Sequence, residues 1–209
     1  MELHEAMRQI SAIKHQMART EQFRGYRAAP AAFSGLLAFA VGASQSILLP
    51  NPGQNLPLYL TLWISVALIS FICSMTDIWL RYHRTSGPLR RETTQLALGQ
   101  FLPALIVGGL LTLAILRVAP DVAWLLPGLW ALFFGLGLLS SARLLPRPIF
   151  AVALYFLTAG LITISQGSPD FSFSHWTMPL IFGVGQLASA VVLFTDEQTH
   201  DNQTRDSAQ

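Results

Sequence analysis

Long apolar stretches separated by short polar connections fill the chain from residue 30 to residue 195. Each stretch is about 20 residues long, the length at which an α-helix crosses about 30 Å of hydrocarbon. Because the bilayer interior offers no water to backbone polar groups, such a stretch spans it as a helix. The pattern predicts six transmembrane helices, at approximately 30–49, 57–79, 96–116, 122–142, 148–166 and 176–195.

Proline and glycine mark the connections between these stretches, for example in "RVAPD" at 117–121 and "RLLPRP" at 143–148. These residues end one helix before the next begins. Short connections favour antiparallel neighbours, so the expected fold is an all-α integral membrane protein with six transmembrane helices in three antiparallel hairpins. The openings "PAAFSGLL" and "PALIVGGLL" are similar, but too few positions match to decide whether the hairpins are repeats.

An amphipathic cytoplasmic helix is expected before the first span, within residues 1–29. Leu3, Ile10 and Met17 belong to an apolar stripe with alternating spacings of three and four, and Gly25 can bend or end the helix. The helix could lie on the membrane surface, associate with copies of itself or dock a partner. The surface-lying or self-docked form is favoured, because so short a stripe makes a poor autonomous coiled coil.

The segment after the last span, residues 196–209, is polar and has no apolar periodicity. This composition predicts a disordered cytoplasmic tail. The expected domain division is therefore an amphipathic segment at 1–29, a six-helix bundle at 30–195 and a tail at 196–209.

Charge is scarce, since charged residues make up 11% of the chain against about 25% in soluble proteins. All of the 13 lysines and arginines except Arg117 fall on one side of the predicted spans. Cytoplasmic loops are rich in these residues, so both termini are expected in the cytoplasm and the protein in the plasma (inner) membrane. The arginines expected to meet lipid headgroups and set this orientation are Arg19, Arg24, Arg27, Arg81, Arg84, Arg90, Arg91, Arg143 and Arg147.

Two polar side chains inside the predicted spans are candidate functional residues. Asp77 is the one formally charged residue within a span, and intramembrane carboxylates often serve as proton or ion sites. However, it lies near the inner end of its span and four residues before Arg81, which favours an interfacial acid–base pair. Gln186 lies midway along the last span, where its amide either bonds across a packed interface beside small residues or lines a substrate path. Packing is the favoured interpretation.

Other polar residues give weaker indications. Gln45, Gln100 and Gln166 lie toward the ends of their spans, where water can reach them. Cys73 is the single cysteine, so an intramolecular disulfide is excluded. No pattern typical of a metal site, a phosphate-binding loop or a catalytic nucleophile is found in the sequence. We therefore expect no cofactor, no metal and no enzymatic activity.

The expected function is that of a non-enzymatic membrane component, an accessory subunit, scaffold or sensor that works through contacts. The alternative is a small oligomeric transporter or channel for a neutral or weakly polar solute. The expected partners are the lipid bilayer and either further copies of the chain or another membrane protein, bound through residues 3–20 or through small-residue helix faces. Nucleic acid is not expected, because the net charge is only +2 and the arginines follow the orientation bias.

Overall fold

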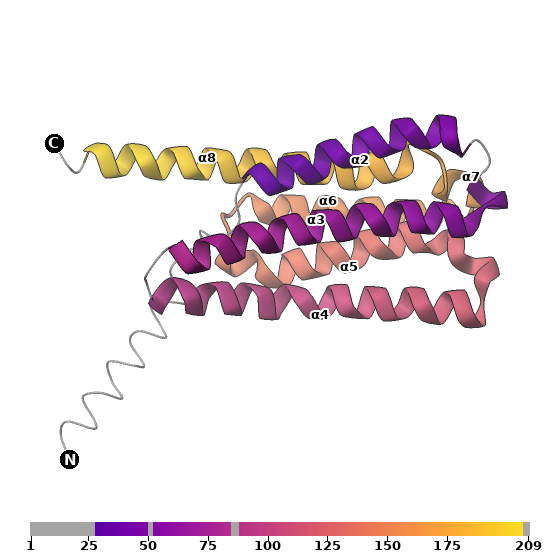
Figure 1. The fold of residues 1–209 in the computed structure, drawn as a ribbon, viewed down its shortest axis with the longest axis horizontal. Coiled ribbons are helices and arrows are strands. Elements are labelled where there is room, and N and C mark those ends of the chain that lie inside the picture. Colours follow the sequence, from indigo (N-terminus) through magenta and orange to yellow (C-terminus); the bar gives the residue numbers. More distant parts are fainter. Residues whose placement is uncertain (1–27, 50–51, 85–87, 207–209) are drawn as a thin grey trace, which may run out of the picture.

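The computed structural model describes residues 28–49, 52–84 and 88–206, and this part of the chain consists of helices joined by short turns, without strands (Figure 1). The described residues include only the last two positions of the predicted amphipathic segment at 1–29. Arg19, Arg24 and Arg27 lie outside them. The long helices are α2 Ala28–Leu48, α3 Leu56–Arg84, α4 Pro88–Val118, α5 Leu126–Ser141, α6 Ile149–Ser165 and α8 Val184–Asp206. The short helices are η1 Pro52–Gln54, η2 Pro120–Leu125, η3 Ala142–Leu144, α7 Pro169–Ser172 and η4 Pro179–Gly183, the last a π-helix.

Five helical segments of the described chain are long and apolar enough to cross a membrane. They are Ala28–Leu48, Leu56–Leu80, Leu98–Val118, Pro120–Leu144 and Pro179–Asp196. The apolar helix at the predicted fifth span, α6, has only 17 residues, because prolines precede it and Gly167, with a φ of 59°, follows it. The all-helical membrane fold is thus found, while the number six stays a prediction.

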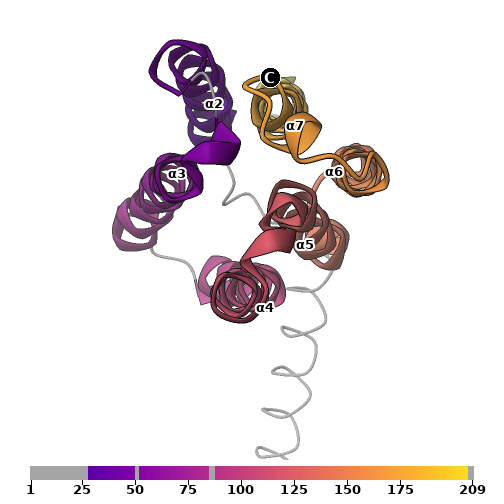
Figure 2. The same ribbon diagram turned by 90° about the vertical axis from the view of Figure 1, so that its right-hand side faces the viewer.

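Successive long helices run in opposite directions along one axis (Figure 1). We name the two ends of the bundle by the short helices there: the α7 end, which also holds η1 and η2, and the η3 end. Viewed from the α7 end, the long helices surround the centre in the order α2, α3, α4, α5, α6 and α8 (Figure 2).

The most extensive packing joins α5 to α6, followed equally by α2 to α8 and by α4 to α5, the last a predicted hairpin. Glycines allow these close approaches: a Cβ at Gly160 would lie 2.7 Å from the carbonyl oxygen of Gly128, and a Cβ at Gly42 would lie 2.1 Å from Pro179 Cγ. The α5–α6 and α2–α8 pairs join helices assigned to different predicted hairpins. The grouping into three hairpins therefore stays a prediction.

Three differences from the predicted boundaries have local causes. The helix α5 begins at Leu126 instead of near residue 122, because Pro120 and Pro127 favour a separate 3-10 turn, η2, before it. The regular part of the last span begins at Val184, after the π-helix η4. The helix α8 extends to Asp206, because no proline or glycine interrupts its propagation, and the disordered tail at 196–209 stays a prediction.

Candidate functional site

A cavity of about 590 Å³ lies in the centre of the bundle and opens between α3 and α4. Within the described residues, α3 packs mainly on α2 and has no extensive packing on α4 or α5. Its separation from α4 is visible from the α7 end (Figure 2). Leu68 of α3 and Ile106 of α4 line the cavity yet are 55% and 52% exposed. The cavity is therefore accessible from the side of the bundle.

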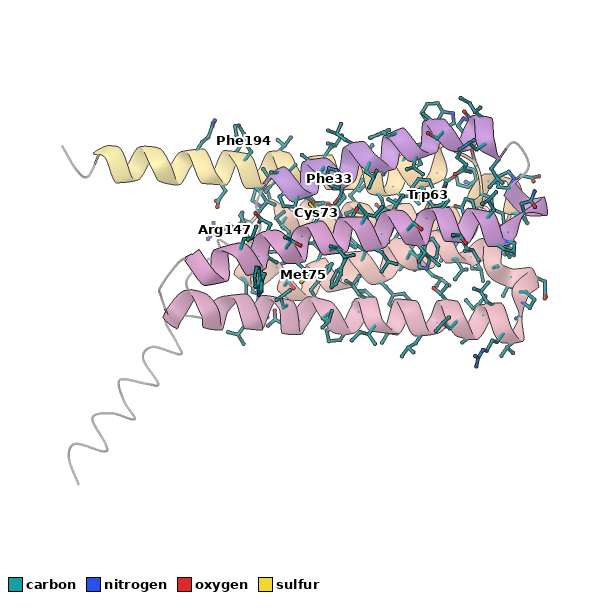
Figure 3. The ribbon with its side chains drawn as sticks, in the orientation of Figure 1. Phe33, Trp63, Cys73, Met75, Arg147 and Phe194 are labelled. Atoms are coloured by element: carbon teal, nitrogen blue, oxygen red, sulfur yellow. The ribbon has the colours of Figure 1, made fainter. Side chains whose placement is uncertain are left out.

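The walls of this cavity are almost entirely apolar and include no formally charged side chain. Along α3, the wall extends from Trp63 toward the α7 end past Met75 to Ile78 toward the η3 end (Trp63 and Met75 are labelled in Figure 3). The polar side chains in the lining, apart from the two indoles, are Ser34, Ser70, Ser74, Thr112, Ser141 and Gln186. Such a lining, with few polar groups in an apolar surface, is typical of a small-molecule site.

A cluster of phenylalanines supports part of the cavity wall: Phe101, Phe134 and Phe182 line the cavity, and Phe156 is buried outside the lining. The ring of Phe134 lies 5.2 Å from that of Phe101, 4.7 Å from that of Phe156 and 5.7 Å from that of Phe182, measured between centroids. The tilted and edge-to-face angles are those that aromatic quadrupoles favour. The cluster joins α4, α5, α6 and η4, so the wall is a packed surface that does not depend on a ligand.

Two tryptophans in the lining have their indole N–H groups satisfied by the protein. Trp63 Nε1 donates to Gln45 Oε1 at 2.9 Å, and Trp130 Nε1 donates to Thr112 Oγ1 at 2.8 Å. Thr112 in turn donates to the carbonyl oxygen of Gly108. With these donors occupied, both indoles offer the cavity mainly their apolar ring surface.

Gln186 lines the cavity, as one of the two earlier hypotheses requires. Its side chain is half-buried, and its amide has no hydrogen bond to any part of the chain that the structure describes. Packing in the form of an interhelical amide hydrogen bond is therefore not observed. The small residues beside it are used within the chain itself, since a Cβ at Gly185 would meet the ring of Phe156.

Asp77 is not brought to this site. It is half-buried in α3 and does not line the cavity, although Met75 and Ile78 beside it do. It is engaged in an interaction of its own. The predicted pairing with Arg81 depends on a side chain outside the described ones, so the interfacial pair stays a prediction.

The basic residues collect at one end of the bundle. Arg81 and Arg84 belong to the last turns of α3, and Arg90 and Arg91 to the first turns of α4. Arg143 lies within η3 and Arg147 follows it (Figure 3), both with exposed side chains. Arg117 lies in the last turn of α4 at the opposite, α7 end. The backbone thus gathers these predicted orientation residues at the η3 end.

The sequence suggested that water can reach Gln45, but the structure shows its side chain fully buried. Besides accepting from Trp63, its Nε2 donates to the carbonyl oxygen of Phe173 at 2.9 Å. Gln45 also lines a second pocket of about 640 Å³ at the α7 end, together with polar residues such as Asp170 and His175. Because Phe173 lies 128 residues beyond Gln45, no local sequence signal could have indicated the contact.

Around Gln45, two further polar atoms are buried. Tyr59 Oη and Ser172 Oγ have no hydrogen-bond partner among the described residues, and the Tyr59 ring contacts that of Phe173 edge-to-face at 4.8 Å. In the described ranges, no three histidine, cysteine, aspartate or glutamate side chains meet in a way that could hold a metal ion.

A comparison of the chain with protein-family models, curated proteins and solved structures finds no match.

Proposed function

We propose that this protein is a non-enzymatic membrane component, an accessory subunit, scaffold or sensor, that binds an apolar molecule between α3 and α4. The single observation behind the proposal is the uncharged, aromatic-walled cavity of about 590 Å³ that opens at the side of the bundle. This volume falls within the range of about 300–1,000 Å³ that is usual for ligand sites.

The route of entry also supports lateral binding. The outward faces of α3 and α4 are apolar, with Ile72 and Leu110 more than half exposed and outside the lining, as expected for helices that contact lipid tails. A molecule dissolved in the bilayer would pass between the two helices without crossing a polar surface. A bound molecule would then act through the position of α3, the long helix with the least packing against the rest of the bundle.

The test of this proposal is gentle purification followed by native mass spectrometry. The wild type should retain an apolar molecule. Ala67→Trp, which adds bulk to a lining residue of α3, should release it, whereas Ala114→Trp on an exposed position of α4 outside the lining should not. A wild type without any bound apolar molecule, in a detergent that preserves its fold, would contradict the proposal.

A second candidate function is the transport of a neutral or weakly polar solute by an oligomer. It is favoured by the Gln45–Trp63 hydrogen bond, because Gln45 lines the pocket at the α7 end and Trp63 lines the central cavity. The pair would then close a path between the two spaces. Trp63→Ala should increase solute flux into proteoliposomes if this is right, and unchanged flux in a folded variant would count against transport.

We further propose that the η3 end faces the cytoplasm, with both termini there, in a plasma (inner) membrane. The collection of arginines at that end supports this orientation. The segment at 1–29 would then lie along the cytoplasmic surface, where Arg19, Arg24 and Arg27 could meet lipid headgroups. Residues 3–20 would be available there to a partner or a second copy.

A further inference from the structure

The amide of Gln186 is the one side-chain amide in the lining of the central cavity. It offers two N–H donors and a carbonyl acceptor, and none of these is hydrogen-bonded within the described chain. Two hydroxyls of the lining already donate within the chain, Ser34 to the carbonyl oxygen of Pro30 and Thr112 to that of Gly108. The amide is therefore free to bind a ligand.

The depth of Gln186 limits the ligand to uncharged chemistry. Its neighbour Gly185 lies against Phe156, close to the centre of α6, so the amide is near the middle of the bundle along its axis. A charged or zwitterionic headgroup brought to the bilayer centre is strongly disfavoured, and no charged side chain of the lining could compensate it. An ordinary phospholipid can thus offer its chains here but not its headgroup.

We propose that the cavity selects an uncharged lipid with one carbonyl or hydroxyl group that hydrogen-bonds to the Gln186 amide. This inference rests on the apolar binding proposed above. A carbonyl accepts from Nε2, and a hydroxyl donates to Oε1 or accepts from Nε2. The rest of the molecule lies against the wall formed by Phe134, Phe182 and Trp130. A purely hydrocarbon ligand fits the same wall but leaves the amide unpaired.

The experiment compares two probes in phosphatidylcholine liposomes: a dibrominated long-chain ketone with its carbonyl at mid-chain and a dibrominated alkane of equal length. Bromine quenches tryptophan fluorescence on contact. Of the protein's five tryptophans, Trp79, Trp124 and Trp176 lie outside the lining and are replaced by phenylalanine. Trp63 and Trp130 then report from the cavity wall.

We expect the ketone to quench at a mole fraction about fivefold lower than the alkane, the ratio that one hydrogen bond in an apolar interior provides. Gln186→Met, which keeps length but removes the amide, should make the two probes equal. Gln186→Asn, which keeps an amide, should retain part of the preference. The Met variant should unfold at the same or a higher temperature than the parent, because it no longer holds an unpaired amide.

The outcomes separate the ligand class from the proposed function. Equal quenching by both probes in the parent protein overturns the choice of ligand and leaves apolar binding intact. Absence of quenching by either probe, in a protein with an unchanged unfolding midpoint, overturns apolar binding itself. If Gln186→Met lowers the midpoint sharply and abolishes binding of both probes, Gln186 is a structural contact and the inference is wrong.

Discussion

The Gln45 amide satisfies partners on two other segments of the chain. Its oxygen accepts from Trp63 of α3 and its nitrogen donates to the backbone of Phe173, after α7. Since Gln45 itself is fully buried and Trp63 is 2% exposed, neither partner can turn to solvent instead. Gln45 thereby fixes the indole of Trp63, which lines the central cavity, while Gln45 itself lines the pocket at the α7 end.

We expect Gln45→Leu to destabilise the protein by about 2–6 kcal/mol, because it leaves the Trp63 N–H and the Phe173 carbonyl without their partner, at about 1–3 kcal/mol for each buried group. The matched control is Gln100→Leu, at an exposed position of α4, which should change the stability little. Thermal unfolding in detergent, followed by intrinsic fluorescence, measures both variants. Equal midpoints would mean that the buried hydrogen bonds do not stabilise the fold.

At the scale of elements, the π-helix η4 is held against α2 by the absence of a side chain at Gly42. An added Cβ there would lie 2.1 Å from Pro179 Cγ and 2.9 Å from the carbonyl oxygen of His175. On the other side of η4, the Tyr155 hydroxyl of α6 donates to the carbonyl oxygen of Leu180. This bond supplies a partner to an element whose backbone departs from regular α-helical geometry.

Gly42→Ala should therefore cost about 1–3 kcal/mol or more, because the ring of Pro179 and a backbone carbonyl, unlike the end of a flexible side chain, cannot easily move away. Gly99→Ala is the control, since a Cβ at that position of α4 meets nothing within 4 Å, and alanine favours helix by about 1 kcal/mol. The unfolding midpoint should fall for the first variant and stay or rise for the second. A fall of similar size in both would show that glycine is not needed for the α2–η4 contact.

The existence of the spans could be predicted from the sequence, but their packing could not. Hydropathy places the first span at 30–49 and the structure at Ala28–Leu48, because a bilayer sets both the length and the composition of a helix. In a membrane the lipid-facing side is as apolar as the packed side, so periodicity does not reveal that α3 leaves a cavity beside α4. The sequence also does not distinguish the buried Gln45 from Gln186 in the cavity, because the hydrogen bonding of each depends on distant segments.

At the scale of the whole molecule, the described chain has a basic end and an end nearly free of basic residues. The η3 end holds Arg143 and Arg147 together with the arginine-bearing ends of α3 and α4, whereas Arg117 lies at the α7 end. The pocket lined by Gln45, Asp170 and His175 opens at that α7 end. If lysine and arginine set the orientation as they do in other multi-pass proteins, this pocket faces away from the cytoplasm.

That orientation predicts which positions a membrane-impermeant maleimide can reach in intact cells. In a Cys73→Ser background, which removes the single native cysteine, Gly53→Cys places a thiol in η1 at the α7 end, at a position where a Cβ meets nothing within 4 Å. Asn202→Cys places one in the part of α8 beyond its candidate span. The first should be labelled almost completely in intact cells and the second only after the membrane is opened. The reverse pattern would show that the arginines do not determine the orientation, and labelling of both in intact cells would mean that α8 ends outside the cytoplasm.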